Sequence, residues 1–384
     1  MDERRHPDAV TATPRARASP APPLRVGLIG CGRAAETLHL PVLKRTPEVK
    51  VVAATDVDAE RLARVCERFR IPRAYPEASA LLGDQAVEAV AICVPVRFHV
   101  EAALAALDAG KHVFLEKPLA LDLDEVDRLI TRTARVPRKV MIGFNLRWHR
   151  LVRAARDLLR SHAVGRPVII RTTNTTGLHH RYALPGWRDR RASGGGVLIE
   201  VAVHHFDLLR FLCGAEIEEV FACSRSERSE DEAATVMARM SGGILVALAF
   251  ADRSHDTNEI EVFGEAGRLR LDVYRLDGLS LAPVLRTPGI VPPRSGPDGG
   301  SASGLPRPSA LARRSGDVLV SYQSEWRHFA ECVQRDQPVD CTVEDGRRAL
   351  EVMLAALASA TSGRPVPVGQ APRAVTPGGG PPTG

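Results

Sequence analysis

The sequence predicts an α/β protein with two domains: an N-terminal domain that alternates strands with helices, and a C-terminal α+β domain with a mostly antiparallel sheet. Three observations lead to this prediction. Short apolar strands and amphipathic helices alternate through residues 24–143. From residue 144 to about residue 367 the rhythm changes to strands joined by tight turns. The length of 384 residues also exceeds what one domain usually holds.

The first domain is expected to contain a parallel sheet with helices on both faces, because strands that alternate with helices need crossover connections. Glycine and aspartate mark the helix ends, with Asp58 as an N-cap and Gly110 as a C-terminal stop. The expected strands are 24–29, 49–55, 87–94, 111–115 and 139–143. The expected helices are 35–44, 58–69, 98–109 and 122–135.

The second domain is expected to be rich in strands, with tight turns such as Ser241-Gly-Gly243 between them. The expected strands are 167–173, 218–224, 235–240, 244–251, 259–263 and 268–273, and closing helices are expected at 323–333 and 344–362. Residues 283–316 are rich in Pro, Gly, Ser and Arg, which predicts a long flexible loop. The composition of residues 1–23 and 368–384 predicts a disordered arm and a disordered tail.

Composition and charge argue against several classes of protein. An apolar content of 44% and a charged content of 26% are typical of a soluble globular chain. The net charge of +6 comes from arginines that form no basic block, so no nucleic-acid partner is expected. No apolar run reaches the length of a membrane span. The seven cysteines are scattered without a Cys-x-x-Cys pair, which favours a reducing, cytoplasmic location.

A glycine-rich turn between the first strand and the first helix predicts a dinucleotide site. Gly30-x-Gly32-x-x-Ala35 allows the backbone to approach a pyrophosphate at the N-terminus of the helix. Asp56 ends the second strand, where an acid binds the ribose hydroxyls. A carboxylate there repels a 2′-phosphate, so the expected cofactor is NAD rather than NADP. The alternatives are an ordinary turn for the glycines and a helix cap for Asp56.

A second candidate site stands at the end of the strand 111–115. The apolar run Val113-Phe-Leu115 stops at Glu116-Lys117-Pro118, because proline cannot donate to a sheet ladder. Ligands of open α/β sheets bind beyond the carboxyl ends of the strands, which places Glu116 and Lys117 near the chemistry. The chain has only five lysines, and an ammonium can lose its proton when partly buried. The alternative is a solvated lysine at a strand end.

A third candidate site lies in residues 194–214, where three glycines lead into an apolar pattern of helical spacing. Glu200 and His204 are spaced i, i+4, and His204 and Asp207 are spaced i, i+3, so they are expected on nearly the same helix face. A carboxylate that orients an imidazole is the usual arrangement for a general base. The alternatives are a core histidine and a metal site. Two ligands are too few for a metal, so none is expected.

With these segments in place, the chain resembles the Gfo/Idh/MocA family, the group of glucose–fructose oxidoreductase and inositol dehydrogenase. The resemblance covers about residues 24–275 and 320–367 and includes the nucleotide fingerprint with Asp56. The other segments that carry it are Ala109-Gly-Lys-His-Val-Phe-Leu-Glu-Lys-Pro-Leu-Ala120, Gly143-Phe-Asn-Leu-Arg147, Gly194 to Gly214, and Glu344-Asp-Gly followed by Ala-Thr-Ser-Gly-Arg364. The Glu-Lys-Pro stretch in this position is highly specific.

The resemblance implies a Rossmann dinucleotide-binding domain and an α+β domain whose large open sheet forms homodimers or homotetramers. It implies Lys117 as the active-site lysine, which a cis bond before Pro118 would aim at the nicotinamide, and His204 as the catalytic histidine. Glu200 stands where many members have an aspartate that touches the substrate. The implied cofactor contacts are Gly30, Gly32, Arg33, Ala34, Asp56, Val94, Pro95, His99, Glu116 and Lys117.

The sequence also departs from the family pattern around the expected substrate pocket. Val96 stands where the family usually has asparagine, and Ala202 stands where it usually has glycine. Together with Glu200, these departures indicate a substrate pocket that differs from the standard one. The expected substrate contacts are Arg147, Arg181, Trp187, Arg188 and His205.

The expected reaction is NAD-dependent oxidation of a secondary alcohol, or the reverse reduction of a ketone, on a polyol, sugar or nucleotide sugar. His204 in its neutral form takes the hydroxyl proton, and Lys117 polarises the same oxygen. Glu200 orients His204 or holds a neighbouring hydroxyl. Two alternatives remain: a lyase or glycosidase that uses bound NAD transiently, and an NAD-binding regulator without turnover.

Overall fold

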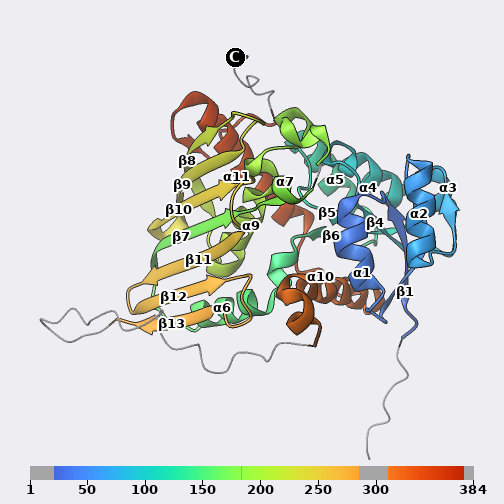
Figure 1. The fold of residues 1–384 in the computed structure, drawn as a ribbon, viewed down its shortest axis with the longest axis horizontal. Coiled ribbons are helices and arrows are strands. Elements are labelled where there is room, and N and C mark those ends of the chain that lie inside the picture. The colour runs from blue at the N-terminus through green and yellow to red at the C-terminus, as the bar shows by residue number, and fades with distance from the viewer. Residues whose placement is uncertain (1–20, 183, 285–309, 376–384) are drawn as a thin grey trace, which may run out of the picture.

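The structure, a computed structural model, describes residues 21–182, 184–284 and 310–375. Two sheets lie next to each other, with the N-terminal domain in blue and cyan and the larger sheet in green to orange (Figure 1). Residues 1–20 of the expected disordered arm 1–23 lie outside the described residues. So do residues 285–309 of the expected loop and residues 376–384 of the expected tail.

The N-terminal domain contains a six-stranded sheet in the order β3-β2-β1-β4-β5-β6, and every pair is parallel. The strands are β1 Leu24–Ile29, β2 Val49–Thr55, β3 Ala74–Tyr75, β4 Ala89–Ile92, β5 His112–Glu116 and β6 Val140–Gly143. The strand order reverses between β1 and β4. In sheets of this kind the ligand crevice opens at that switch point, beyond the carboxyl ends of the strands.

Helices connect these strands on both faces of the sheet, as the alternating pattern predicts. The first connection is a π-helical turn, Ala35–His39, that continues into α1. Asp58 accepts a hydrogen bond from Arg61 N and caps α2 as expected. The helices are α1 Leu40–Leu43, α2 Ala59–Phe69, α3 Ala78–Gly83, α4 His99–Asp108 and α5 Leu123–Thr133. The sequence pattern missed β3 and α3, which are too short to show a period.

The second sheet has eight strands in the order β13-β12-β11-β7-β10-β9-β8-β14. Only the β7–β10 pair is parallel, so the prediction of a mostly antiparallel sheet is confirmed. The strands are β7 Pro167–Thr175, β8 Ile217–Arg225, β9 Ala233–Met240, β10 Ile244–Ala251, β11 Thr257–Gly264, β12 Gly267–Asp272, β13 Leu279–Pro283 and β14 Val366–Pro367. Alternating burial along β9 and β10 shows that one face of the sheet is covered and the other is exposed.

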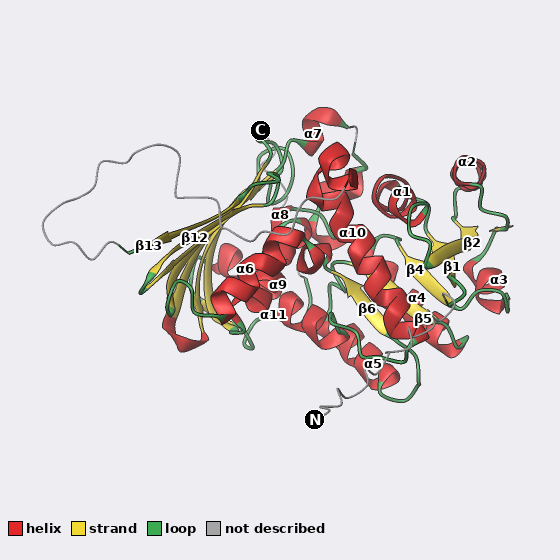
Figure 2. Cartoon of the chain, turned by 90° about the horizontal axis from the view of Figure 1, so that it is seen from below, coloured by secondary structure: helices red, strands yellow, loops and turns green. Residues whose placement is uncertain are grey.

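Helices cover only the inner face of this sheet, toward the first domain (Figure 2). The helices of the second half of the chain are α6 Arg150–Arg160, α7 Leu178–Arg181, α8 Val197–Glu200, α9 Ala202–Cys213, α10 Ala310–Gln334 and α11 Val343–Ser362, of which α10 packs on the first domain instead of this sheet. A capping box begins α11, in which the Thr342 hydroxyl accepts from Asp345 N and the Asp345 carboxylate accepts from Thr342 N. Helix α10 starts at Ala310, inside the segment 283–316 that the sequence predicts as a loop, so that boundary was wrong.

Helix α10 returns from the second half of the chain to pack on the first domain. Its Trp326 is fully buried and stacks on Phe114 of β5, with ring centroids 4.2 Å apart. Phe329 meets the same two rings edge-on, at 5.8 Å from each. This aromatic cluster anchors the strand that leads to Lys117, because buried rings contribute several kcal/mol each through their area.

The segment after α11 crosses back to the first domain, which corrects part of the expected tail. After β14, Val368 N donates to Glu218 O at 2.8 Å. Further on, Arg373 O accepts from Leu123 N at 2.8 Å. The Arg373 side chain pairs with Asp124 at 2.7 Å and also contacts Asp127. These contacts, together with Val368, Ala371 and Val375 packed against the core, order residues 368–375.

Candidate active site

The glycine-rich turn has the conformation that the fingerprint requires. Gly30 has φ +93°, and a Cβ there would lie 2.8 Å from the Cys93 carbonyl, so only glycine fits. A Cβ at Gly32 would meet no atom within 4 Å, which leaves the backbone of the turn open to a ligand. Arg33 and Ala34 follow at the start of the helix, whose N–H groups face that opening. The turn therefore fits a pyrophosphate.

Asp56 lies beside this turn at the carboxyl end of β2. Its Oδ2 accepts a hydrogen bond from Cys31 N at 2.7 Å, and its Oδ1 accepts from Asp58 N at 2.9 Å. Arg61 forms an ion pair with the same Oδ1 at 3.0 Å. Asp58, not Asp56, caps the helix, so the alternative role for Asp56 does not apply. These contacts hold its carboxylate at the position expected for the ribose.

The turn after β4 contacts the Lys-Pro turn after β5. His99 is buried, and its ring nitrogens lie 2.9 Å from Val94 O and 2.8 Å from Pro118 O. Both nitrogens of His99 face backbone carbonyls, so its side chain joins the two turns and is not turned toward a cofactor. Val94 and Pro95 lie between the end of β4 and the 3₁₀ turn Val96–Phe98.

Lys117 extends from the end of β5 into the space between the domains. The peptide bond between Lys117 and Pro118 is cis, as the resemblance implies. Its Nζ donates to the Glu200 carbonyl at 3.0 Å. Burial lowers the pKa of Lys117 to about 8, Glu116 opposes that shift, and Arg188 and Arg33 add to it. The lysine is thus a partly buried cation that loses its proton at a pH of about 8.

The helix expected over residues 194–214 is broken at Val201, which separates α8 from α9. The Glu200 carboxylate pairs with Arg188, whereas the His204 Nδ1 atom is buried without a partner among the described residues. The expected pairing of Glu200 with His204 is therefore wrong, because the i, i+4 spacing assumed a continuous helix. Burial and Lys117 lower the pKa of His204 well below its ordinary value, so it is neutral.

Asp207 does not orient His204 either. It accepts two hydrogen bonds from Arg147, at 2.8 Å to Oδ2 and 2.5 Å to Oδ1, and Arg147 also pairs with Asp345 at 3.0 Å. The arginine is 5% exposed, and its charge is fully used in joining the 3₁₀ turn after β6 to α9 and α11. Arg147 as a substrate contact is therefore wrong. It is a structural residue at the domain junction.

Of the other expected substrate contacts, some point away from Lys117 and others lie close to it. His205 is fully buried and its Nδ1 lies 2.5 Å from Thr172 Oγ1, so it points into the sheet and not into the cleft. Arg181 is exposed and pairs with Asp256 at 2.5 Å, away from Lys117. Arg188 remains, since it contacts Glu200 and lies near enough to lower the pKa of Lys117. Trp187 is half-buried, with the Arg188 guanidinium 5.6 Å from its ring centroid.

The two departures from the family pattern are buried at the back of the cleft. A Cβ on Gly194 would lie 2.3 Å from Val96 Cγ1, so the valine packs tightly against the glycine turn that begins α8. Ala202 is fully buried at the start of α9. Neither side chain offers a polar group to a substrate, unlike the asparagine that the family usually has at position 96.

Sequence patterns missed several residues of the site because their partners are far apart in the chain. Tyr182 places its ring 5.4 Å from the Arg33 guanidinium, across the cleft from the fingerprint turn. His39 contacts Glu116 and Trp326, which are 77 and 287 residues away. Glu116 thus turns its carboxylate into the core instead of toward a cofactor. No periodicity or short motif carries information on such contacts.

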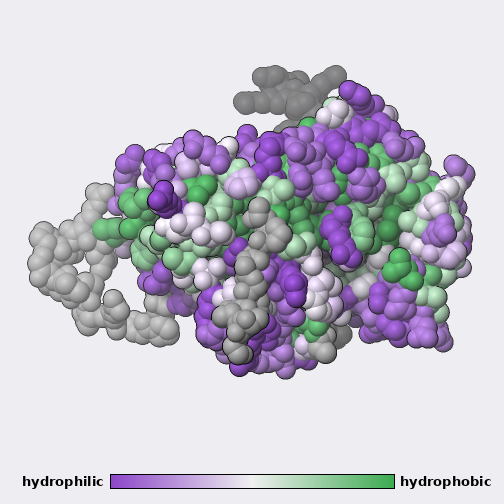
Figure 3. Space-filling model, turned by 90° about the horizontal axis from the view of Figure 1, so that it is seen from above, coloured by the Kyte–Doolittle hydropathy of each residue, from purple (hydrophilic) through white to green (hydrophobic). Residues whose placement is uncertain are grey.

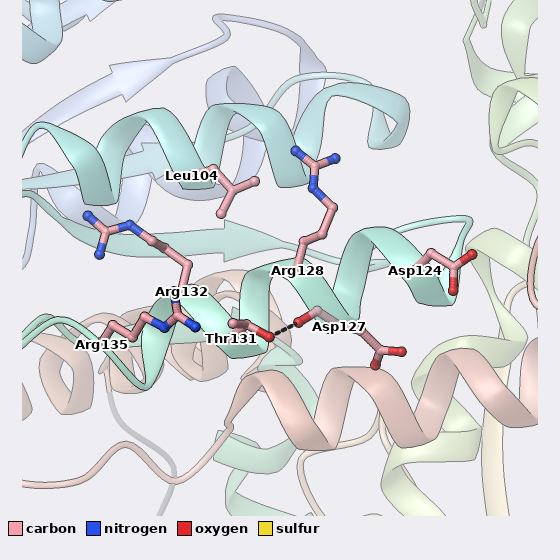
Figure 4. A pocket seen from close by; sticks show the side chains of 7 residues that line it. All are labelled: Leu104, Asp124, Asp127, Arg128, Thr131, Arg132 and Arg135. Atoms are coloured by element: carbon pink, nitrogen blue, oxygen red, sulfur yellow. Dashed lines mark hydrogen bonds between the residues drawn. The ribbon is translucent and has the colours of Figure 1, made fainter.

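Other features of the surface do not compete with this site. A shallow pocket between α4 and α5 is lined by Leu104, Asp124, Asp127, Arg128, Thr131, Arg132 and Arg135 (Figure 4). It contains none of the site residues, and its charged side chains largely pair with one another or with their neighbours. Across the described part of the chain, His, Cys, Asp and Glu do not gather in threes as a metal site would require. No described helix combines the length and apolar character needed to cross a membrane.

Comparison with known proteins agrees with this geometry. Residues 24–144 match the model of an oxidoreductase family with an NAD-binding Rossmann fold, and residues 152–270 match the GFO/IDH/MocA C-terminal domain. Myo-inositol 2-dehydrogenase of Thermotoga maritima is 30% identical over 353 residues, which covers 89% of this chain and 98% of that protein. The 1,5-anhydro-D-fructose reductase of Ensifer adhaerens is 28% identical over 343 residues, 88% of this chain and 97% of the reductase.

Solved structures give the same answer for the fold. A probable dehydrogenase from Thermotoga maritima superimposes with a TM-score of 0.73 at 30% identity, over 91% of this chain and all of the other. Levoglucosan dehydrogenase in complex with NADH gives a TM-score of 0.77 at 23% identity, over 90% of this chain and 99% of the other, a likeness of fold alone. With both domains matched, the chain belongs to the Gfo/Idh/MocA family of oxidoreductases.

Proposed function

We propose that the protein oxidises a secondary alcohol of a polyol, sugar or nucleotide sugar with NAD, or catalyses the reverse reduction. One observation carries the proposal: Lys117 of the first domain and His204 of the second converge beyond the carboxyl end of β5, at the same edge of the sheet as the fingerprint turn. The names of the relatives, an inositol dehydrogenase and an anhydrofructose reductase, support this class of substrate.

Each residue has a role that follows from its charge. His204 is neutral, so it takes the hydroxyl proton during oxidation and returns it during reduction. Lys117 is a cation below pH about 8 and stabilises negative charge on the same oxygen. Bound NAD supplies the acceptor and donor of hydride at its nicotinamide ring. The Arg188–Glu200 pair lies beside them and is placed to hold a neighbouring hydroxyl.

A panel of polyols, sugars and nucleotide sugars tests the function when the purified protein is given NAD and followed by NADH absorbance. Net NADH with one of these compounds supports the proposal. Product without net NADH identifies the lyase or glycosidase alternative. If no compound of the panel gives a product, the NAD-binding regulator becomes the better account. The seven free cysteines support a reducing, cytoplasmic location for the protein, so the assays should contain a thiol reductant.

Asp56 is expected to make NAD the preferred cofactor over NADP. A hydrogen bond to a charged group contributes ~1.5–3 kcal/mol, so wild-type protein should bind NAD about tenfold or more tightly than NADP. Replacing Asp56 with asparagine should remove most of this difference. Asp58→Asn is the matched control, because Asp58 contacts the same Arg61 yet caps α2. Fluorescence titration of both cofactors measures the dissociation constants, and equal values in wild type would exclude the role given to Asp56.

Glu200 and Arg188 are expected to act as one unit in turnover. Glu200→Gln removes the charge that pairs with Arg188, and Glu200→Asp shortens the reach by a methylene, so each should lower kcat, the former by about tenfold. Arg188→Gln should cause a similar loss. If the pair acts together, the double variant Arg188→Gln/Glu200→Gln should be no slower than either single variant. Independent, additive losses would show that the two residues act separately.

We further propose that the outer face of the larger sheet binds a second copy of this chain. Exposed apolar side chains from five neighbouring strands lie in register there, with Leu245 opposite Ile169 and Met237 opposite Phe221. They are Ile169, Phe221, Met237, Leu245 and Phe263. Green apolar patches interrupt the polar surface on the side of this sheet (Figure 3). An exposed patch of this kind is typical of an interface between subunits.

Light scattering tests the oligomer. Wild-type protein should have a multiple of the chain mass of 41.5 kDa, and Met237→Asp/Leu245→Asp should reduce it to that of one chain. NAD affinity should stay unchanged, since neither residue lies near the fingerprint turn. A wild-type protein that elutes as a single chain at micromolar concentration would contradict the proposed interface.

A further inference from the structure

A chain of hydrogen bonds runs through the core behind Lys117. Trp326 Nε1 donates to His39 Nδ1 at 3.0 Å, and His39 Nε2 lies 2.6 Å from Glu116 Oε1. The other carboxylate oxygen, Oε2, accepts from the Lys117 backbone N–H at 3.0 Å. Trp326 and His39 are fully buried and Glu116 is 7% exposed. The chain therefore joins α10, the first helical turn, and β5 to the residue that carries the chemistry.

The direction of the hydrogen bonds follows from the indole. Trp326 Nε1 can only donate, so His39 Nδ1 must accept and carries no proton. The remaining proton of the neutral imidazole is then on Nε2, where it is donated to Glu116. Among the described residues no other side chain donates to this carboxylate. The Trp326 indole therefore fixes the tautomer of His39, and the Nε2–H of His39 stabilises the negative charge of Glu116.

We propose that His39 and Trp326 are positioning residues that keep Glu116 ionised beside Lys117, so that the buried lysine retains its charge. The inference rests on the role given to Lys117 in the proposed function. None of the three residues touches the reacting atoms. They act through the charge of Glu116 and through the backbone at Lys117.

The charges that face Lys117 explain why it needs this support. Arg188 faces Lys117 from the second domain, and Arg33 faces it from the fingerprint turn. His204 is neutral, and Lys117 contacts Glu200 only at its backbone carbonyl. Burial, together with these two arginines, lowers the pKa of Lys117, and Glu116 is the group that raises it. Without the charge of Glu116, the pKa of Lys117 would fall still further below its ordinary value.

The groups that face Glu116 show in turn why it needs His39. Cys93, directly after β4, and Tyr322 and Glu325 of α10 lie near the carboxylate, and the thiol, phenol and carboxyl of these residues all have raised pKa values because of burial. Burial also raises the pKa of Glu116, but the interactions with His39 and Lys117 together outweigh it, and the net pKa is below the ordinary value. Loss of the imidazole donor should therefore raise the pKa of Glu116.

Titration of the lysine side chains by NMR tests the inference without substrate or turnover. Protein labelled with ¹³C at lysine Cε gives signals from only five lysines: Lys44, Lys50, Lys111, Lys117 and Lys139. Lys117→Met assigns the decisive signal. Lys111 is the internal control, because it is held by the carbonyls of Asp84 and Val87 at the opposite end of β5. An unchanged Lys111 signal shows that a variant has kept its fold.

Two replacements of His39 form a matched pair. The amide of His39→Gln reaches Glu116 as a donor, whereas the shorter amide of His39→Asn reaches only Trp326. We expect the Lys117 midpoint to fall by about one pH unit or more in His39→Asn and in Glu116→Gln, and to stay near the wild-type value in His39→Gln. A wild-type midpoint in His39→Asn, or in Glu116→Gln, would overturn the inference.

Trp326→Phe provides a second route if His39→Asn does not fold. It keeps the ring that stacks on Phe114 and removes only the indole donor. Without the indole donor, nothing holds the proton of His39 on Nε2, and the tautomer with the proton on Nδ1 cannot donate to Glu116. The Lys117 midpoint should again fall, and an unchanged midpoint would overturn the inference. If Lys117→Met keeps full activity, the proposed function fails, whereas the titration still decides what the three residues do.

Discussion

Replacing Lys117 with methionine is expected to lower kcat by at least about 10²–10³-fold, the cost of losing one donor to a developing oxyanion. Methionine has a similar length and no charge, so it should fill the same space. NAD affinity should change by less than about threefold, because Lys117 lies at the end of β5 and not at the fingerprint turn. Steady-state kinetics measures the first effect, and tryptophan fluorescence measures the second.

Lys111→Met is the matched control for this substitution. Lys111 is also a buried lysine next to β5, but it binds carbonyls at the far end of the strand. Its loss should lower the melting temperature and leave kcat close to wild type. If Lys117→Met lost NAD binding together with activity, the lysine would belong to the cofactor site and not to the reacting oxygen.

The pH dependence should follow from the same residue. Lys117 is charged below its folded pKa of about 8 and neutral above it. Stabilisation of negative charge on the substrate oxygen should therefore be complete well below pH 8 and disappear as pH rises through that value. In the direction of ketone reduction, kcat/KM should fall on the alkaline side. Lys117→Arg should remove this decrease, because the guanidinium stays charged throughout.

Replacing His204 with glutamine is expected to lower kcat by about 10²–10⁴-fold, the usual contribution of a general base. His205→Gln is the matched control, since the neighbouring imidazole points at Thr172 inside the sheet. That variant should lose stability and keep its turnover number. Stopped-flow rates of NADH formation separate the two, and equal losses of kcat in both variants would mean that His204 acts only through packing.

The fold could be predicted from local pattern because the pattern reports burial directly. Alternation of apolar strands and helices is sufficient to identify the parallel sheet, and the strand 244–251 was placed at its observed bounds. Short elements such as β3 and α3 were missed, because two to six residues carry no period. The ordered segment 368–375 was also missed, since its backbone hydrogen bonds, the Arg373 ion pairs and its few scattered apolar contacts show no periodic pattern.

In the candidate site, the positions of residues at strand ends could be predicted, whereas the roles of several other residues could not. Residues at strand ends, such as Asp56 and Lys117, lie where an α/β sheet requires them to lie. Roles that assumed a regular helix failed, because Val201 interrupts it and turns Glu200 toward Arg188. Arg147 was misassigned for a third reason: the sequence did not indicate that Asp207 and Asp345 would neutralise it in the core.

Tracing deuterium from substrate to cofactor tests most directly the claim that this site transfers hydride from a carbinol carbon. The compound that reacts in the panel is prepared with deuterium at the oxidised carbon and incubated with stoichiometric NAD and protein. Mass spectrometry of the nicotinamide cofactor should then find one deuterium per molecule of ketone formed in wild type, and over the same time Lys117→Met and His204→Gln should form far less of both products. Ketone formed while the cofactor stays free of deuterium would contradict the account.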